Sequence, residues 1–312
     1  LVAAGGTGMR PFILGTRGSS LALCQARIVQ TKLEASLRDR PIRLQTIKAQ
    51  ADRHPDVTLV ALGGEGIFVK ELEEALLASR IDAAVHSLKD LPLTLPPPLR
   101  IAAVLKRDEP RDALVSRSGD PLDRLPSGAR IGTSSLRRRS QLWHQRRDLT
   151  LLEIRGNVDT RLRKLDEGQY DAIVVAACGL IRLGLEERIT EYLDFSQMLP
   201  EPGQGALAIE ARVDDRTTLD LVSVLEDPVS RACVEAERAF LRMLGGGCRV
   251  PIAAYASCKE GLLELEGAVI APDGHKEIRG TLSAPITDPI LLGNRLAQRL
   301  ESEGALDLLK PS

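Results

Sequence analysis

A lysine and an aspartate follow a short apolar segment of the sequence. Ile81 to Val85 has the composition of a buried β-strand, Lys89 and Asp90 come soon after it, and Pro92 stops any helix from continuing. In open α/β sheets, ligands bind at the carboxyl ends of the strands. A lysine there supplies a cation for an anionic substrate, and an aspartate supplies a carboxylate for a developing positive charge. The alternative is that both are solvated charges in a surface turn.

Arginines are concentrated in the middle of the chain. Nine of them stand against three acids in one segment: Arg130, Arg137, Arg138, Arg139, Arg146, Arg147, Arg155, Arg161 and Arg163. A guanidinium binds carboxylate or phosphate in a planar, bidentate geometry and keeps its charge at any relevant pH. The segment therefore predicts a cleft for a small, multiply charged anion, with a solvated basic face as the alternative. A nucleic-acid surface is disfavoured because aromatic residues, which stack on bases, make up only 3% of the chain.

Cys248 is the cysteine best placed for chemistry. Three glycines precede it and Pro251 follows it, which predicts a loop with little side-chain cover. A thiol in such a loop favours nucleophilic or attachment chemistry. The sequence places no histidine partner beside it, and the four histidines have no metal-ligand spacing, so no metal site is predicted.

Two pairs of similar segments predict a duplicated architecture. Gly15-Thr-Arg-Gly-Ser-Ser-Leu21 lies between an expected strand and a helical pattern, and Arg130-Ile-Gly-Thr-Ser-Ser-Leu136 repeats this arrangement. Ile81 to Val85 is likewise similar to Tyr170 to Val174. Serine and threonine before an apolar-periodic run mark a helix start, where backbone N–H groups favour an anion. We therefore predict two similar α/β units, each with a helix N-terminus facing a cleft.

The connections between expected elements predict three domains. Domain 1 spans 9–105 and 206–224, domain 2 spans 106–205, and a small α+β domain 3 spans 228–312. No apolar run reaches the roughly 18 residues that a membrane span needs. The five cysteines form no CxxC pair, and their odd number argues against a disulfide framework, which favours a reducing cytoplasm. Nothing in the sequence demands an interface, so a monomer is expected.

Four motifs in the same order resemble the hydroxymethylbilane synthase family, also called porphobilinogen deaminase. The most specific, Glu237 to Ala253, is similar to the family's cofactor-attachment signature. The other three are His86-Ser-Leu-Lys-Asp-Leu-Pro92, Gly132-Thr-Ser-Ser-Leu-Arg-Arg138 and Pro202-Gly-Gln-Gly-Ala206. The similarity is collinear from about Ile13 to the expected C-terminal helix.

The resemblance implies a transferase of tetrapyrrole and heme biosynthesis. Cys248 would hold a dipyrromethane cofactor through a thioether, and the enzyme would assemble this cofactor from its own substrate. Four porphobilinogen units would then be added, each with loss of ammonia, before water releases the linear tetrapyrrole hydroxymethylbilane. The implied fold has two domains that resemble type II periplasmic binding proteins, with a cleft between them, and a small α+β C-terminal domain.

The resemblance also implies roles for single residues. Asp90 matches the catalytic aspartate that stabilises pyrrole N–H groups and the developing positive charge. Lys89 and Arg17 would assist it, Arg17 as a candidate for proton transfer. Residues that would bind the cofactor, besides Cys248, are Lys89, Asp90, Thr133, Ser135, Arg137, Arg138, Arg155, Gly156 and Arg161. Residues that would bind the substrate are Arg17, Ser19, Arg182 and Gln204. Because each porphobilinogen carries two carboxylates, the growing chain needs many cations.

One position departs from the family pattern, and one alternative function remains. Glu65 stands where the family more commonly has lysine, in a segment that is usually a mobile lid, so we expect slower elongation or altered salt dependence. The alternative is a non-catalytic protein of the same fold that binds a small anion, as a transport receptor or an effector domain. Such a protein has no use for Cys248 or for Asp90 in an anion site.

Overall fold

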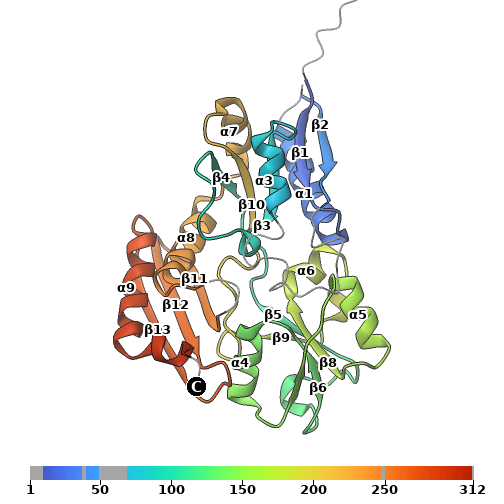
Figure 1. The fold of residues 1–312 in the computed structure, drawn as a ribbon, viewed down its shortest axis with the longest axis vertical. Helices are drawn as coiled ribbons and strands as arrows, with labels where there is room; N and C mark the ends of the chain where they lie inside the picture. The colour runs from blue at the N-terminus through green and yellow to red at the C-terminus, as the bar shows by residue number, and fades with distance from the viewer. Residues whose placement is uncertain (1–9, 37–39, 49–68, 247–249, 311–312) are drawn as a thin grey trace, which may run out of the picture.

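The computed structural model describes residues 10–36, 40–48, 69–246 and 250–310. These residues form two five-stranded sheets and one three-stranded sheet. Figure 1 shows the two larger sheets one above the other, with the C-terminal part of the chain beside them. Among the described helices, none is long and apolar enough to cross a membrane.

The first sheet has the strand order β2-β1-β3-β10-β4. Strands β1, β2 and β3 are parallel, and β10 runs antiparallel to both of its neighbours. Helices α1 and α7 pack on one face through Val29 and Val222, and α3 covers the other face through Leu72 and Leu76. The bounds of these elements are β1 Phe12–Thr16, α1 Ser20–Ser36, β2 Ile42–Thr46, α3 Lys70–Leu77, β3 Ala83–Ser87, β4 Leu99–Val104, β10 Leu207–Arg212 and α7 Arg216–Val222.

The second sheet has the strand order β7-β6-β8-β5-β9. Helix α4 packs on one face through Leu142, and α5 and α6 pack on the other through Leu162 and Leu180. The bounds are β5 Asp112–Ser116, η2 Leu122–Arg124, β6 Arg130–Gly132, α4 Leu136–Gln145, β7 Thr150–Leu152, α5 Val158–Asp166, β8 Ala172–Ala176, α6 Ala177–Arg182, η3 Glu186–Arg188 and β9 Glu191–Leu193.

The two sheets have the same architecture. In each, three parallel strands are followed by one antiparallel strand and an edge strand. The repeated Ser-Ser-Leu segments, at 19–21 and 134–136, lie at equivalent places, because β1 leads into α1 and β6 leads into α4. The two similar apolar segments are β3 and β8, which occupy the same position in their sheets. The predicted fold class, two α/β units of the type II periplasmic-binding kind with a small C-terminal α+β part, is therefore confirmed.

Two connections join the sheets. Residues 105–111 lead from β4 to β5, and residues 194–206 lead back from β9 to β10. They lie against each other, since Arg107 Nε donates to the carbonyl of Gln204 at 2.7 Å. The short apolar segment after the second connection is β10, which joins the first sheet.

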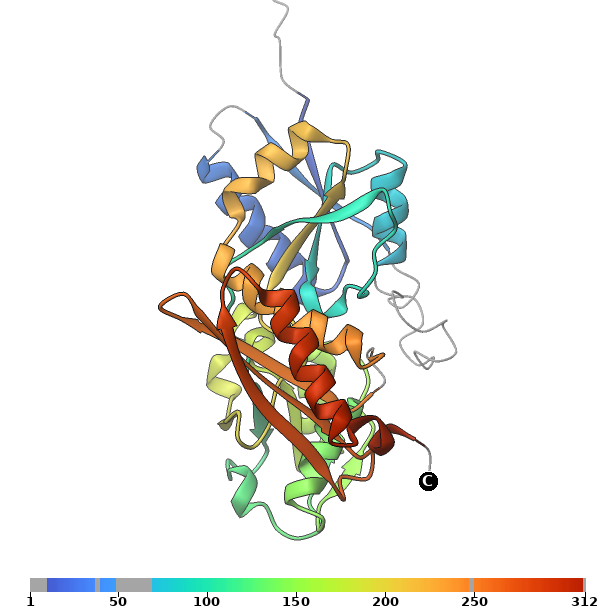
Figure 2. The same ribbon diagram turned by 90° about the vertical axis from the view of Figure 1, so that its left-hand side faces the viewer.

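The C-terminal part is an antiparallel three-stranded sheet covered by α8 and α9. Figure 2 shows α9 lying along this sheet, and Phe240, Leu265 and Leu296 are completely buried between them. Helix α8 begins with Pro228, and Asp227 caps it by accepting from the Ser230 N–H at 2.7 Å. The turn at residues 272–274, whose Pro-Asp-Gly sequence is typical of a hairpin, joins β12 to β13. The bounds are η4 Ser223–Leu225, α8 Pro228–Met243, β11 Ile252–Lys259, β12 Leu262–Ile270, β13 Glu277–Pro285, α9 Pro289–Ser302 and η5 Ala305–Leu309.

Candidate active site

Lys89 and Asp90 lie in a single 3-10 turn at the carboxyl end of β3. This turn, η1 (Leu88–Asp90), is anchored by the completely buried side chain of Leu88. The expected strand Ile81–Val85 is shifted in the structure: β3 begins at Ala83 and continues through Ser87. It extends further because β10 offers an antiparallel partner as far as Ser87.

Asp90 faces a small pocket that two elements of the first sheet share. The pocket, about 50 Å³, is lined by His86 of β3, by Asp90 of the turn that follows it, and by Arg17 and Ser19 from the segment before α1. Ser19 also starts that helix, since its Oγ accepts from the Ala22 N–H at 3.3 Å. The structure therefore brings three of the expected catalytic and substrate-side residues to one cavity.

The charge of Asp90 is controlled by its surroundings. Burial raises the pKa of Asp90, and the positive charges of Lys89 and Arg17 oppose this rise without cancelling it. Glu201 adds to the rise. A positive charge that forms beside such a carboxylate stabilises its ionised form, because burial leaves little water to do so.

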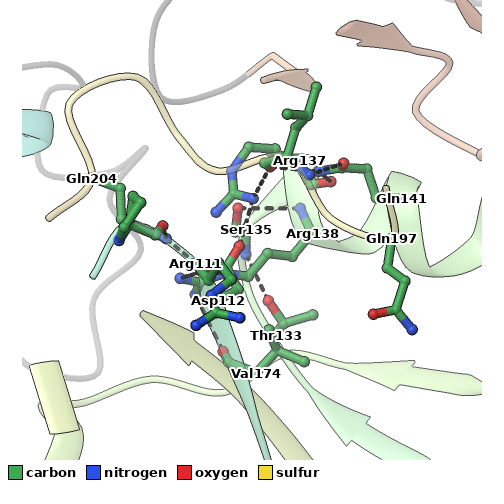
Figure 3. Close-up of polar contacts among 12 residues, drawn as sticks. Arg111, Asp112, Thr133, Ser135, Arg137, Arg138, Gln141, Val174, Gln197 and Gln204 are labelled. Atoms are coloured by element: carbon green, nitrogen blue, oxygen red, sulfur yellow. Dashed lines mark hydrogen bonds and ion pairs between the residues drawn. The ribbon is translucent and has the colours of Figure 1, made fainter. Parts of the chain in front are cut away.

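Arg137 and Arg138 bind a completely buried aspartate at the start of β5. Asp112 accepts from Arg137 Nη1 at 2.7 Å through one oxygen and from Arg138 Nη2 at 2.7 Å through the other. Figure 3 shows the two guanidinium groups converging on it beside Ser135, which caps α4. Burial alone would raise the pKa of Asp112, but the two charges and their hydrogen bonds hold it well below its usual range.

The two arginines differ in what they have left to donate. Arg138 completes its contacts by donating to the Val174 carbonyl at 3.2 Å. Arg137 Nη1 also donates to the Leu199 carbonyl at 2.7 Å. Within the described parts of the chain, Nε and Nη2 of Arg137 are buried without a hydrogen-bond partner. Unpaired buried donors of a guanidinium favour an incoming carboxylate.

The segment after β7 adds further cations. Arg161 Nε donates to the carbonyl of Gly156 at 2.8 Å, and none of the described acids forms an ion pair with Arg161. Burial lowers the pKa of Arg161 to about 10, and the charge of Arg138 adds to the decrease. Arg155 pairs with the exposed Glu153 at 3.2 Å. Thr133, completely buried, accepts from the backbone N–H of Ser135 at 3.3 Å and shapes the turn before α4.

Arg182 and Gln204, expected on the substrate side, lie at the connections between the sheets. Arg182 is bound to Asp108 at 2.7 Å and to the carbonyl of Gly205 at 2.6 Å. The side chain of Gln204 is 0% exposed and accepts from Lys89 Nζ at 3.0 Å. Neither side chain lines the pocket of Asp90, and each is held by contacts with other parts of the site.

The Arg-rich segment does not form one continuous anion cleft, which corrects the broader interpretation of the sequence. Several of its members are used in local structure: Arg130 binds Asp171 at 2.9 Å, and Arg146 binds Asp148 at 2.7 Å and nearby carbonyls. Arg163 pairs with Glu167 one helical turn away. The fold brings only part of the segment together: Arg137 and Arg138 share Asp112, and Arg161 lies near enough to Arg138 for their charges to interact.

Three further findings bear on the expected site. Cys248 and Glu65 lie outside the described residues. Cys24, whose place in an apolar helical pattern predicts a buried thiol, is partly exposed, and its thiol donates to the Arg182 carbonyl at 2.8 Å. Asp112 was missed by the sequence analysis, although an acid at the start of the apolar segment Asp112-Ala-Leu-Val115 signals a buried carboxylate that needs cationic partners.

Comparison with known proteins identifies the family. A family model described as "Porphobilinogen deaminase, dipyromethane cofactor binding domain" matches residues 12–220, and one for the C-terminal domain matches residues 231–302. A porphobilinogen deaminase from Roseiflexus castenholzii is 51% identical over 296 residues, which cover 95% of this chain and 97% of that protein. The chain belongs to the porphobilinogen deaminase family.

A second porphobilinogen deaminase agrees with this membership. A porphobilinogen deaminase from Syntrophotalea carbinolica is 49% identical over 292 residues, covering 94% of this chain and 93% of that protein. Among solved structures, a ligand-binding component of an ABC-type import system from Staphylococcus aureus is 14% identical, with a TM-score of 0.40 and 75% of each chain covered. The expected transferase activity, that of hydroxymethylbilane synthase, and the expected dipyrromethane cofactor are confirmed as those of the family. The non-catalytic anion-binding alternative is not favoured.

The residues of the second sheet fit a porphobilinogen deaminase cofactor. A dipyrromethane built from porphobilinogen carries several carboxylates, which need fixed cations. Arg137 keeps two buried donors unpaired, and Arg161 is held without an acidic partner among the described residues. Both are features that a bound carboxylate would satisfy.

Proposed function

We propose that the pocket of Asp90 and the arginines of the second sheet together carry out the reaction of the family. This reaction joins four porphobilinogen units onto an enzyme-bound dipyrromethane, with loss of ammonia at each step, and releases hydroxymethylbilane by hydrolysis. The observation that carries the proposal is the shared pocket of Asp90 and Arg17, where a carboxylate with a raised pKa faces a guanidinium.

Asp90 acts on the substrate by electrostatics. Loss of ammonia from porphobilinogen leaves positive charge on the pyrrole ring, and a carboxylate held beside it lowers the energy of that charge. Because Asp90 is half-buried at the end of a short turn, it needs little rearrangement to do so. Lys89 keeps Asp90 ionised, since its charge lowers the pKa of that carboxyl. Arg17 does the same from the other side of the pocket and is placed to bind a substrate carboxylate or pass a proton to the departing amine.

The second sheet holds the cofactor. When bound, the dipyrromethane supplies the primer end to which substrate units are joined, and Cys248 attaches it. Arg137 binds its carboxylates with its unpaired donors, Arg161 binds them with a guanidinium that has no acidic partner among the described residues, and Arg155 does so from a more exposed position. The remaining residues that we propose to bind the cofactor are Lys89 and Asp90 beside the first sheet and Thr133, Ser135, Arg138 and Gly156 of the second.

The substrate side is formed by the first sheet and the connections. Arg17 and Ser19 line the pocket directly. Arg182 and Gln204 support it from behind, through Asp108 and Lys89 respectively. The domain boundaries that we propose are 9–105 and 206–224 for domain 1, 106–205 for domain 2 and 228–312 for domain 3. We further propose that the enzyme works as a cytoplasmic monomer without nucleic-acid or membrane partners.

Intact-protein mass spectrometry tests the proposal. We expect the purified chain to carry an added mass equal to a dipyrromethane, and Cys248→Ala to lack it. Cys258→Ala is the matched control, because Cys258 is partly exposed and should leave the added mass unchanged. On addition of porphobilinogen, stepwise heavier species should appear. If the unmodified chain gains no mass from porphobilinogen, the protein is a binding protein that shares the fold and the proposal is wrong.

A further inference from the structure

One side-chain amide links the first sheet to the second. Gln204 accepts from Lys89 Nζ at 3.0 Å through Oε1. Its Nε2 donates to Asp112 Oδ1 at 2.9 Å and to the carbonyl of Pro110 at 2.8 Å. Figure 3 shows the contact between Gln204 and Asp112. Both side chains are completely buried, so water does not compete for these hydrogen bonds.

The three hydrogen-bond partners of Gln204, one donor and two acceptors, determine which way its amide points. An ammonium only donates, and a carboxylate and a carbonyl only accept. If the amide rotated by half a turn, its oxygen would face Asp112 and Pro110, and its NH2 group would face the ammonium of Lys89. All three contacts would be lost together. The ionised carboxylate of Asp112 therefore keeps the oxygen of Gln204 turned toward Lys89.

Asp112 is suited to this task because it keeps its charge. Arg137 and Arg138 bind its two oxygens, and together they hold the pKa of Asp112 well below its usual range. Its backbone position is equally well determined, since it is the first residue of β5 and pairs with Ala176 of β8 and with β9. The carboxylate of Asp112 is thus held by the second sheet, while its partner Gln204 contacts Lys89 at the end of β3 in the first sheet.

The hydrogen bond between Asp112 and Gln204 lies where the two connections between the sheets meet. Asp112 ends the connection 105–111, and Gln204 lies in the connection 194–206. The hydrogen bond between them therefore joins the two crossings between the sheets, next to the turn that holds Lys89 and Asp90. A change in either residue is transmitted to the catalytic turn and to the arginines at once.

We propose that Asp112 is a positioning residue for the reaction: through Gln204 it sets the Lys89 ammonium beside Asp90, and through its other oxygen it sets Arg137 for anion binding. The buried carboxylate of Asp112 thereby fixes the position of the catalytic turn Leu88–Asp90 relative to Arg137 on the other sheet. The inference rests on the proposed function of Lys89, Asp90 and Arg137.

A double-mutant cycle tests the path from Asp112 to Lys89. Asp112→Asn offers either an oxygen or an NH2 group to Gln204, so the amide loses its preferred orientation. Gln204→Met removes the amide without adding charge. Because hydrogen bonds to charged groups contribute about 1.5–3 kcal/mol, each variant should lower kcat by roughly 10- to 100-fold, with a smaller change in KM. The double variant should lose no more than the worse single variant, since both act on one path.

The control is Asp171→Asn. Asp171 is also an arginine-bound aspartate of the second sheet, paired with Arg130 at 2.9 Å, but it does not touch Gln204. Asp171→Asn should change kcat less than about threefold. When it is combined with Gln204→Met, the fold-losses in kcat of the two single variants should multiply. If the losses in Asp112→Asn and Gln204→Met multiply in the double variant, Asp112 does not act through Gln204 and the inference is wrong.

The position of Lys89 can be followed without activity. In protein with 13C-labelled lysine, the Cε resonance of Lys89 is assigned by its disappearance in Lys89→Arg. We expect this resonance to shift in the same direction in Asp112→Asn and in Gln204→Met, and to stay in place in Asp171→Asn. An unmoved resonance in a folded Asp112→Asn variant would overturn the inference, whether or not the variant is active.

The pH profile separates positioning from a direct effect of charge. Asp90 is faced by Lys89, Arg17, Glu201 and His86. Gln204→Met changes no charge, so a loosened Lys89 should move the acidic limb of the kcat profile to higher pH. Loss of the Asp112 charge acting on Asp90 directly would move it to lower pH. An unchanged limb in Gln204→Met would contradict positioning through Lys89.

Failure of this inference is distinguishable from failure of the proposed function. If Asp90→Asn still turns over porphobilinogen normally, the proposed function itself is wrong. If Asp90→Asn is inactive but the Lys89 Cε resonance does not shift in Asp112→Asn, only the positioning role is wrong. Intact mass must show the dipyrromethane on each variant used for kinetics, so that a failure to assemble the cofactor is not mistaken for slow chemistry.

Discussion

Arg17 and Asp90 line one small pocket although they belong to different connections of the first sheet. The reason is the pairing of their strands. β1 and β3 are parallel neighbours, with Leu14 opposite Ala83, so their carboxyl ends lie at the same edge. Arg17 follows β1 and Asp90 follows β3. Parallel pairing thus places a guanidinium and a carboxylate across one cavity, as expected for the ligand-binding edge of an open α/β sheet.

Asp90 variants should separate charge from position. Asp90→Glu keeps the charge but displaces it by one methylene, and Asp90→Asn removes the charge. We expect kcat to fall by roughly 100-fold or more in both, because misplacing a preorganised group is nearly as costly as losing it. Steady-state kinetics on protein whose intact mass shows the cofactor would check this. Near-normal turnover in Asp90→Glu would remove the role assigned to this carboxylate.

The pH dependence of kcat should report the environment of Asp90. Burial raises its pKa, so the active carboxylate form is lost as pH falls through a value above the usual 3.9 or so of aspartate. Lys89 lowers that pKa, and Lys89→Met should therefore move the acidic limb to higher pH. Rates measured from pH 4 to 9 would show the shift. A limb that moves to lower pH would mean that another group controls it.

Arg137 and Arg138 should differ in their effect on the cofactor. Both bind Asp112, but of these two arginines only Arg137 has buried donors without a hydrogen-bond partner in the described parts of the chain. We expect Arg137→Met to slow cofactor assembly on the apo-protein by about 10- to 100-fold, because losing a hydrogen bond to a charged group costs about 1.5–3 kcal/mol. Arg138→Met, the matched control, should slow it less. The time course of dipyrromethane mass gain measures both, and equal slowing would show that the unpaired donors are not what binds the cofactor.

Gly205 should be intolerant of a side chain for two reasons that can be separated. Its φ is +90°, and a Cβ there would lie 2.8 Å from the carbonyl oxygen of Asp108 in the facing connection. Gly184 has a φ of +70° with open space around it. Gly184→Ala should cost about 1 kcal/mol of unfolding free energy from backbone strain alone. Gly205→Ala should cost about 2 kcal/mol more and lower kcat, because the connections must move apart. Equal losses in denaturant unfolding would contradict the close contact.

Asp112 should make stability depend on acid. Its folded pKa lies below the unfolded value, so its contribution is complete above about pH 4 and is lost as pH falls toward the folded pKa. Asp112→Asn should lower the free energy of unfolding by about 3–5 kcal/mol at pH 7, since it leaves two buried arginines short of a partner. The difference between the two proteins should shrink below pH 4. Chemical denaturation at pH 3, 5 and 7 would test this, and a constant difference would mean that Asp112 is not ionised in the folded protein.

Much of the fold was predictable from local pattern. The repeated Ser-Ser-Leu segments and the two similar apolar segments indicated duplicated α/β units, because strand and helix starts are encoded by neighbouring residues. The bounds of β3 were less accurate. That strand extends through His86 and Ser87 because β10, far away in the sequence, pairs with it. Local composition carries no information about such a partner.

The sequence by itself determined the family and its chemistry, because the motifs around Lys89 and Asp90 and around Cys248 are continuous stretches whose order is preserved. Only the tertiary structure decided which charges are free to act. It showed that Gln204 lies between Lys89 and Asp112, and that Arg130 is occupied by a local acid. The physical reason is that ionic and hydrogen-bond partners are selected by distance in space and by burial. Here the two connections between the sheets bring together residues that the linear sequence keeps far apart.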